Sequence, residues 1–95
     1  MEKTINSSEY QLFLRLLRQA RSSKNINQTE LATQLGSTQV FVSKCERGER
    51  RLDFVECMHW VEALGCSMLD FTRAYLEELE RMRDKEKRLG AAPKN

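Results

Sequence analysis

The sequence has little of what a disulfide-stapled, metal-binding or membrane protein needs: one proline, four glycines, three cysteines and one histidine among 95 residues. Cys45, Cys57 and Cys66 are odd in number and form no Cys-x-x-Cys pair, so neither a disulfide framework nor a four-ligand zinc site is predicted, and no metal or cofactor is expected. No 18-residue apolar run occurs, and the first residues lack the features of a signal peptide. We therefore expect one small soluble domain in the cytoplasm.

The net charge of +2 is the sum of opposed blocks along the chain. Residues 11–51 carry eight Lys and Arg against three Glu, which is +5, whereas residues 52–80 carry one Arg against seven acids, which is −6. Residues 81–95 have six basic and two acidic side chains, which is +4. A basic block can serve a polyanionic partner or simply form a solvated face, and charge alone leaves both interpretations open.

Apolar residues recur with helical spacing, and β-branched residues never alternate over the length of a strand, which predicts an all-α chain. Capping signatures and glycines predict five helices. The expected helices span about 9–23, 27–36, 37–48 and 53–65, with a fifth that begins after Ser67, and the expected N-caps are Ser8, Asn27, Ser37, Asp53 and Ser67. We divide the chain into an N-terminal arm (1–8), a helical domain (9–79) and a mixed-charge helical extension that ends in a disordered tail (80–95).

The fifth predicted helix has an apolar stripe that fades toward its end. Met68, Leu69, Thr72, Leu76 and Leu79 share the stripe, and Phe71 and Tyr75 lie beside it. Past Leu79 the apolar content falls to Met82 and Leu89, and pairs of opposite charge at i, i+4 spacing can hold a solvated helix. The residues from Gly90 to Asn95 are expected to fray.

The stretch from Gln28 to Arg47, QTELATQLGSTQVFVSKCER, has the pattern of two short helices that cross over a tight turn. That geometry requires a small residue where the backbones approach, a glycine at the turn and apolar positions inside, which Ala32, Gly36, Leu31, Leu35, Val42 and Cys45 supply. Cys45 is therefore interpreted as a packing residue. The opposite face of the second short helix presents Thr38, Gln39, Val40, Ser43, Lys44 and Arg47. All of these side chains except that of Val40 can form hydrogen bonds.

On these residues the sequence resembles the Cro-repressor, or xenobiotic-response-element (XRE), class of helix-turn-helix transcription regulators. The resemblance covers about residues 10–76 and is carried by Gln28, Leu31 and Ala32, and by the run from Val42 to Asp53. It implies a five-helix, lambda-repressor-like DNA-binding domain with an extended C-terminal helix. In such a domain the helix-turn-helix, here 28–47, places its second helix in the major groove, and two copies act as a two-fold dimer.

The resemblance also implies roles for individual residues. Base edges would be read by Thr38, Gln39, Val40, Ser43 and Lys44, although Val40 departs from the polar residues common at its position. Phosphates would be bound by Gln28, Arg47, Arg50 and Arg51. Arg21 and Glu46 would form an ion pair that orients the second helix of the motif. The residues expected at the dimer contact are Trp60, Phe71, Tyr75, Leu76 and Leu79, and Trp60 could instead be a core residue.

These expectations describe a cytoplasmic bacterial or phage regulator, a repressor that binds a palindromic double-stranded DNA operator as a homodimer. An enzyme is not predicted, because His59 is the only histidine, Ser43 and Lys44 point about 100° apart on a helix, and no phosphate-cradling glycine loop is present. The alternative is an antitoxin that binds a toxin and represses its own operon, with the acidic stretch 52–80 and the extension as its partner surface. A toxin gene beside this one would favour that alternative.

Overall fold

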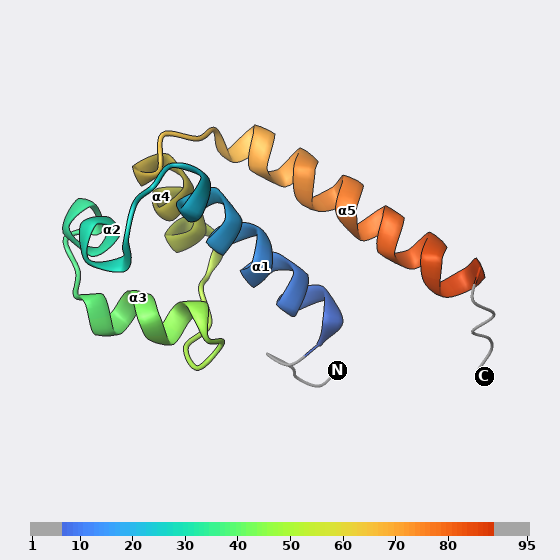
Figure 1. The fold of residues 1–95 in the computed structure, drawn as a ribbon, viewed down its shortest axis with the longest axis horizontal. Coiled ribbons are helices and arrows are strands. Elements are labelled where there is room, and N and C mark those ends of the chain that lie inside the picture. The colour runs from blue at the N-terminus through green and yellow to red at the C-terminus, as the bar shows by residue number, and fades with distance from the viewer. Residues whose placement is uncertain (1–6, 89–95) are drawn as a thin grey trace.

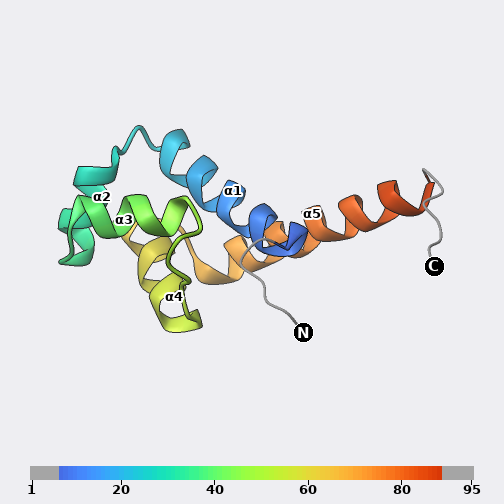
Figure 2. The same ribbon diagram turned by 90° about the horizontal axis from the view of Figure 1, so that it is seen from below.

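The computed structural model describes residues 7–88, and over this range it contains five α-helices and no strand, as the all-α prediction requires. The helices are α1 (Ser8–Ser23), α2 (Gln28–Leu35), α3 (Gln39–Glu46), α4 (Phe54–Ala63) and α5 (Met68–Arg88). In Figure 1, α2 and α3 lie at one end of the molecule, and α1 and α5 run in opposite directions. Figure 2 shows from a second direction that α5 continues past the start of α1, which makes the molecule 45 Å long.

Most helices begin at the N-caps expected from the sequence. Asn27 and Asp53 each form a capping box, in which the side chain accepts the backbone N–H of a Glu three residues on and that Glu accepts in return. The prediction was wrong by one residue at two helices. Ser7, not Ser8, caps α1 by accepting from the Tyr10 amide, and Thr38, not Ser37, caps α3 by accepting from Phe41. Two adjacent hydroxyl residues offer equivalent local signals, so spacing alone does not choose between them.

The hydrophobic core lies where α1 to α4 meet. Its fully buried members come from all four helices and include Leu17 of α1, Leu31 of α2, Val42 of α3 and Trp60 of α4. Gly48, just after α3, has φ +81°, and a Cβ built there would lie 3.2 Å from the Leu14 methyl carbon. A side chain at this position would require the Leu14 side chain to shift and would have to adopt a positive φ, so the close turn over α1 favours glycine.

The side of α5 that faces the domain differs from the predicted stripe. Met68, Phe71 and Tyr75 are half-buried and Leu79 is buried. The other predicted members of the stripe are exposed: Leu69 at 76%, Leu76 at 54%, and Thr72. The aromatic pair named as lying beside the stripe thus forms part of the actual contact with α1.

The expected mixed-charge extension is helical as far as Arg88, because α5 continues without interruption to that residue. The predicted disordered tail from Gly90 and most of the predicted N-terminal arm lie outside the described residues. None of the helices within 7–88 combines the length and apolar character that crossing a membrane requires.

Candidate nucleic-acid interface

The turn between α2 and α3 has the tight geometry that the motif requires. Gly36 ends α2 in the left-handed conformation, with φ +66°, a region that favours glycine. Ala32 is buried at the helix crossing, and Val42 and Cys45 turn the inner face of α3 into the core with no exposed surface. With this face held inside, the remaining faces of α3 are fixed in direction relative to the domain.

The outer face of α3 carries the residues that the sequence predicts as base-reading. Gln39, Val40 and Lys44 are exposed, with Val40 at 58%, and Ser43 is half-buried. Thr38 is exposed, but its hydroxyl oxygen already accepts the Phe41 amide as the N-cap of α3. Its hydroxyl hydrogen and the second lone pair of that oxygen can still bond to another molecule.

The predicted pair of Arg21 and Glu46 is formed and is mostly buried. Arg21 donates from Nε to Glu46 Oε2 at 2.7 Å and from Nη2 to Oε1 at 2.9 Å, a bidentate arrangement between α1 and the end of α3. The Glu46 side chain is 3% exposed and that of Arg21 is 17% exposed. Arg21 also donates to the Ile26 carbonyl at 2.9 Å, so one guanidinium connects α1, the α1–α2 loop and α3.

A chain of side-chain hydrogen bonds leads from this pair to the surface of α3. Gln28 donates from Nε2 to Glu46 Oε1 at 2.9 Å, and its Oε1 accepts from Gln39 Nε2 at 2.6 Å. Gln28 was expected to bind phosphate through its side chain, but here both ends of its amide bind other residues of the domain. The buried carboxylate thus orients Gln28, which in turn orients Gln39.

Arg18 is a member of this cluster that the sequence analysis missed. Its Nη1 donates to the backbone carbonyl of Glu46 at 3.0 Å, at the last residue of α3, where helix carbonyls lack partners within the helix. Arg18 precedes Arg21 by three residues, so both project from one side of α1. That spacing was the available signal, but nothing local indicates a partner 28 residues away.

The three arginines predicted to bind phosphate differ in whether a carboxylate of the domain already pairs with them. Arg47 is paired with Glu49 at 2.9 Å, and Arg50 is paired with Glu56 at 2.7 Å while it lies over the Phe41 ring. Arg51 lies over the ring of Tyr10, 5.0 Å from its centroid, and has no ion pair within residues 7–88. Hydrogen bonds from Arg47 and Arg50 lower the pKa of the Glu49 and Glu56 carboxyls below the usual value, so these pairs are charged at neutral pH.

The predicted dimer residues are mostly used inside the monomer, and Trp60 is a correction. Trp60 is 1% exposed in the core and Leu79 is 7% exposed, so neither offers a surface to a partner. Phe71 and Tyr75 pack edge-on against Phe13, with ring centroids 6.0 and 6.4 Å apart, and the Tyr75 hydroxyl donates to the Glu9 carbonyl at 3.0 Å. Of the predicted set, only Leu76 exposes a large apolar side chain.

Three other large apolar side chains, which were not expected at the dimer contact, are exposed as well. Phe54 at 69% and Val55 at 52% begin α4, and Leu69 at 76% lies one heptad before Leu76 on α5. A helical period identifies stripes, but it does not say which stripe the domain covers.

All three cysteines are free thiols, and two of them are buried. Cys45 and Cys57 are buried, and burial raises the pKa of each thiol to about 11. Among the residues that the structure describes, no group of three His, Cys, Asp or Glu side chains is placed to hold a metal ion. The packing role predicted for Cys45 agrees with its complete burial.

Comparison with known proteins places the chain in a family. The Helix-turn-helix family matches residues 17–71, which is more than half of the sequence. A solved structure of an XRE-family like protein from Pseudomonas syringae pv. tomato str. DC3000 is 45% identical, with 79% of this chain and 87% of that chain covered and a TM-score of 0.66. No curated protein matches the sequence. The chain therefore belongs to the XRE family of helix-turn-helix proteins and is a DNA-binding transcription regulator.

Proposed function

We propose that this protein is a repressor that binds a palindromic operator as a homodimer, with α3 of each copy in the major groove. The observation that carries the proposal is the outer face of α3. It presents the exposed side chains of Gln39, Val40 and Lys44 on a helix whose inner face is buried in the core. An α-helix fits the major groove, where base edges are distinguishable.

Gln39 is the residue best prepared to read a base. One hydrogen of its Nε2 is held by Gln28, which leaves the second hydrogen and the Oε1 acceptor free. Those two groups match the N7 acceptor and the N6 donor of adenine. Because Gln28 is itself held by buried Glu46, the Gln39 amide is pre-oriented before DNA arrives, which reduces the entropy lost on binding.

The remaining exposed groups of α3 complete the proposed reading surface. Lys44 suits the O6 and N7 acceptors of guanine, and Val40 suits the methyl group of thymine. Thr38 and Ser43 are secondary contacts. Because Thr38 also caps α3, the hydrogen-bond donor that it can present comes from a fixed position at the start of the helix.

Phosphate binding is assigned to the arginines of the loop after α3 and to Gln28, whose Nε2 keeps one N–H that is not used by its bond to Glu46. Arg51 can bind phosphate directly, whereas Arg47 and Arg50 would exchange a carboxylate for a phosphate. The exchange is feasible because both pairs are substantially exposed, and exposed ion pairs contribute under about 1 kcal/mol. The basic block 11–51 and the acidic block 52–80 would make the molecule electrically polar, which favours approach by one face.

The homodimer contact is assigned to the exposed apolar residues Phe54 and Val55 of α4 and Leu69 and Leu76 of α5. Charge supports a role for α5, because its residues 68–80 carry one basic and four acidic side chains whereas residues 81–88 carry five basic and two acidic ones. An antiparallel pairing of two α5 helices about a two-fold axis would place each acidic half beside a basic half. The two α3 helices would then need to lie about 34 Å apart to reach successive major grooves.

Specificity is tested by selecting bound fragments from random DNA and then measuring variants on the selected site. Gln39→Ala and Lys44→Ala should each cost about 1 to 3 kcal/mol on that site and relax preference at one base pair. Arg50→Ala should weaken binding to specific and random DNA alike. Gln34→Ala, an equivalent change on the exposed side of α2, is the matched control for Gln39→Ala and should leave binding unchanged.

Two outcomes would contradict the roles assigned to these residues. Equal losses on selected and random DNA for Gln39→Ala and Lys44→Ala would reassign both residues to phosphate contact. If six or more phosphates are neutralised per dimer, affinity should fall by about 10³ or more between 50 and 200 mM salt. A complex insensitive to salt would contradict the roles given to the arginines.

The dimer contact is tested by sedimentation and by operator binding of Leu76→Lys. The new charge should dissociate the dimer and remove cooperative binding of two half-sites. Ala74→Lys adds the same charge about 200° around α5 from Leu76 and should remain dimeric. A dimeric Leu76→Lys protein would exclude this face of α5 as the contact.

A further inference from the structure

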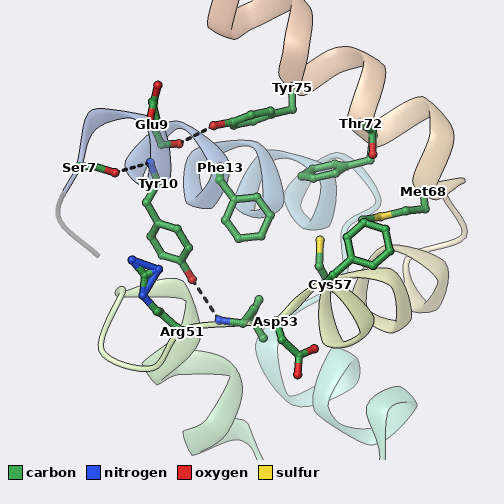
Figure 3. Close-up of a pocket in the computed structure, with 13 residues that line it drawn as sticks. Ser7, Glu9, Tyr10, Phe13, Arg51, Asp53, Cys57, Met68, Thr72 and Tyr75 are labelled. Atoms are coloured by element: carbon green, nitrogen blue, oxygen red, sulfur yellow. Dashed lines mark hydrogen bonds between the residues drawn. The ribbon is translucent and has the colours of Figure 1, made fainter. Parts of the chain in front are cut away.

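A cavity of about 450 Å³ lies between α1, the loop before α4 and the first half of α5, away from the outer face of α3 (Figure 3). Its lining is largely apolar and includes the rings of Tyr10, Phe13 and Phe71 and the side chains of Cys57 and Met68. Small-molecule sites in proteins usually measure about 300 to 1,000 Å³ and combine such a lining with a few placed polar groups. The cavity is open to solvent on one side, and its volume and its largely apolar lining lie in the range of ligand sites.

The charged groups that line the cavity differ in whether they are already satisfied. Glu9 accepts from Arg83 Nη2 at 2.8 Å, and Asp53 accepts the Glu56 amide at 2.7 Å as the N-cap of α4. Arg51 has neither an ion pair nor a side-chain hydrogen bond within residues 7–88, and its guanidinium lies over the Tyr10 ring. Arg51 is therefore the cation of the lining and has no ion pair within residues 7–88, with up to five N–H donors in a planar fork, whereas the carboxylate of Asp53 accepts a backbone N–H and is held at the start of α4.

We infer that this cavity binds a small amphiphilic carboxylate, an organic anion whose apolar part fills the cavity and whose carboxylate meets Arg51. A bidentate guanidinium–carboxylate contact suits the planar group of Arg51, and the aromatic walls suit an alkyl chain or a ring. Of the residues assigned to the dimer contact, Phe54 lines the cavity, whereas Val55, Leu69 and Leu76 do not. The proposed dimer contact therefore adjoins the cavity at Phe54, and the ligand and a second copy would share that one residue.

Occupation of the cavity has a consequence for DNA binding that rests on the proposed function. Arg51 belongs to the loop that follows α3 and is one of the arginines assigned to phosphate. A carboxylate held by Arg51 would compete with that phosphate. The backbone beside Arg51 is also tied to the cavity wall, because the Leu52 amide donates to the Tyr10 hydroxyl at 3.2 Å. The ligand would thus act as an inducer that weakens operator binding.

The site itself is tested without DNA, by calorimetric titration of the full chain with decanoate below its micelle concentration. Saturable one-to-one binding is expected, and decyltrimethylammonium, with the same chain and the opposite charge, should bind at least tenfold more weakly. Arg51→Gln should weaken decanoate binding about tenfold, which corresponds to about 1.4 kcal/mol. Arg73→Gln removes the same charge from an exposed site on α5 that does not line the cavity, and it should bind decanoate as the unaltered chain does.

A second pair of variants tests the location of the ligand. Thr72→Phe places a ring at the cavity wall and should reduce decanoate binding, whereas Ala74→Phe adds the same ring to an exposed position of α5 outside the lining and should not. Thermal melts establish that each variant is folded. Amide chemical-shift changes on titration should gather on Phe13, Cys57 and Thr72.

The inference is overturned if decanoate does not saturate, if the cationic probe binds equally well, or if Arg51→Gln binds decanoate unchanged. Loss of binding as the chain dimerises would mean that a second copy covers the cavity instead. In a separate measurement, decanoate should lower operator affinity of the unaltered chain and not that of Arg51→Gln. Decanoate binding without any operator binding would refute the proposed function and leave the ligand site standing.

Discussion

Substituting Arg21 tests the buried network behind α3, because Arg21→Ala removes three hydrogen bonds at once. Two of them hold the Glu46 carboxylate, whose side chain is 3% exposed, and the third holds the Ile26 carbonyl. Glu46 would keep the Gln28 amide as a partner, but its charge would be uncompensated in a buried site. Breaking a buried pair in this way costs about 3 to 5 kcal/mol, and the 17% exposure of Arg21 argues for the lower end.

The expected destabilisation of about 3 kcal/mol would lower the melting temperature by about 12 °C or more, at about 4 °C per kcal/mol for a domain of this size. Circular dichroism melts and urea titrations measure it. Arg73→Ala is the control, because it deletes an exposed pair with Asp70 on α5 and should cost under about 1 kcal/mol. Combining Arg21→Ala with Glu46→Gln should recover part of the loss, because the buried charge is removed with its partner.

Two results would refute this reasoning. If Arg21→Ala and Arg73→Ala melt alike, the ion pair does not hold the domain together. If Arg21→Ala is as stable as the unaltered chain yet binds the operator weakly, Arg21 acts by touching DNA. The network predicts instead that stability and operator binding fall together, because Glu46 orients Gln28 and Gln28 orients Gln39.

Two further predictions concern the backbone and the thiols. Gly48→Ala should lower the melting temperature measured by calorimetry more than Gly36→Ala does. Both glycines have positive φ, but only a Cβ at position 48 would lie 3.2 Å from a core methyl group. Equal losses of stability would show that this contact relaxes freely. A thiol reagent at neutral pH should label Cys66 first. Burial raises the pKa of the Cys45 and Cys57 thiols to about 11, which keeps both protonated and shielded from the reagent. Rapid labelling of all three cysteines in the folded chain would contradict the burial of Cys45 and Cys57.

The local structure of this protein could be predicted because its signals lie close together in the sequence. The capping boxes of α2 and α4 each involve residues three apart, and the buried face of α3 follows from helical spacing. The errors at the starts of α1 and α3 arose where two hydroxyl residues stood side by side, so that the local signal was degenerate. The motif also predicted the Arg21–Glu46 pair, through resemblance rather than through spacing.

The predictions for α5 failed for a different physical reason. Periodicity showed that α5 has apolar residues on more than one side, but only packing against α1 decides that Phe71 and Tyr75 face inward and Leu69 outward. The same limit applies to Trp60. A large aromatic residue serves a core or an interface equally well, and its 1% exposure is a property of the assembled domain.

The sequence by itself determined that the chain is helical, where its helices lie to within a residue or two, and which short segment forms the helix-turn-helix, because those properties rest on interactions between near neighbours. The tertiary structure decided which arginines are already paired, that Gln28 is held by a buried carboxylate, which side of α5 is covered and that a cavity lies beside Arg51. These properties depend on contacts such as Gln28 with Glu46, 18 positions apart, and Glu9 with Arg83, 74 apart. No local pattern encodes such partners, since they meet only when the whole chain has folded.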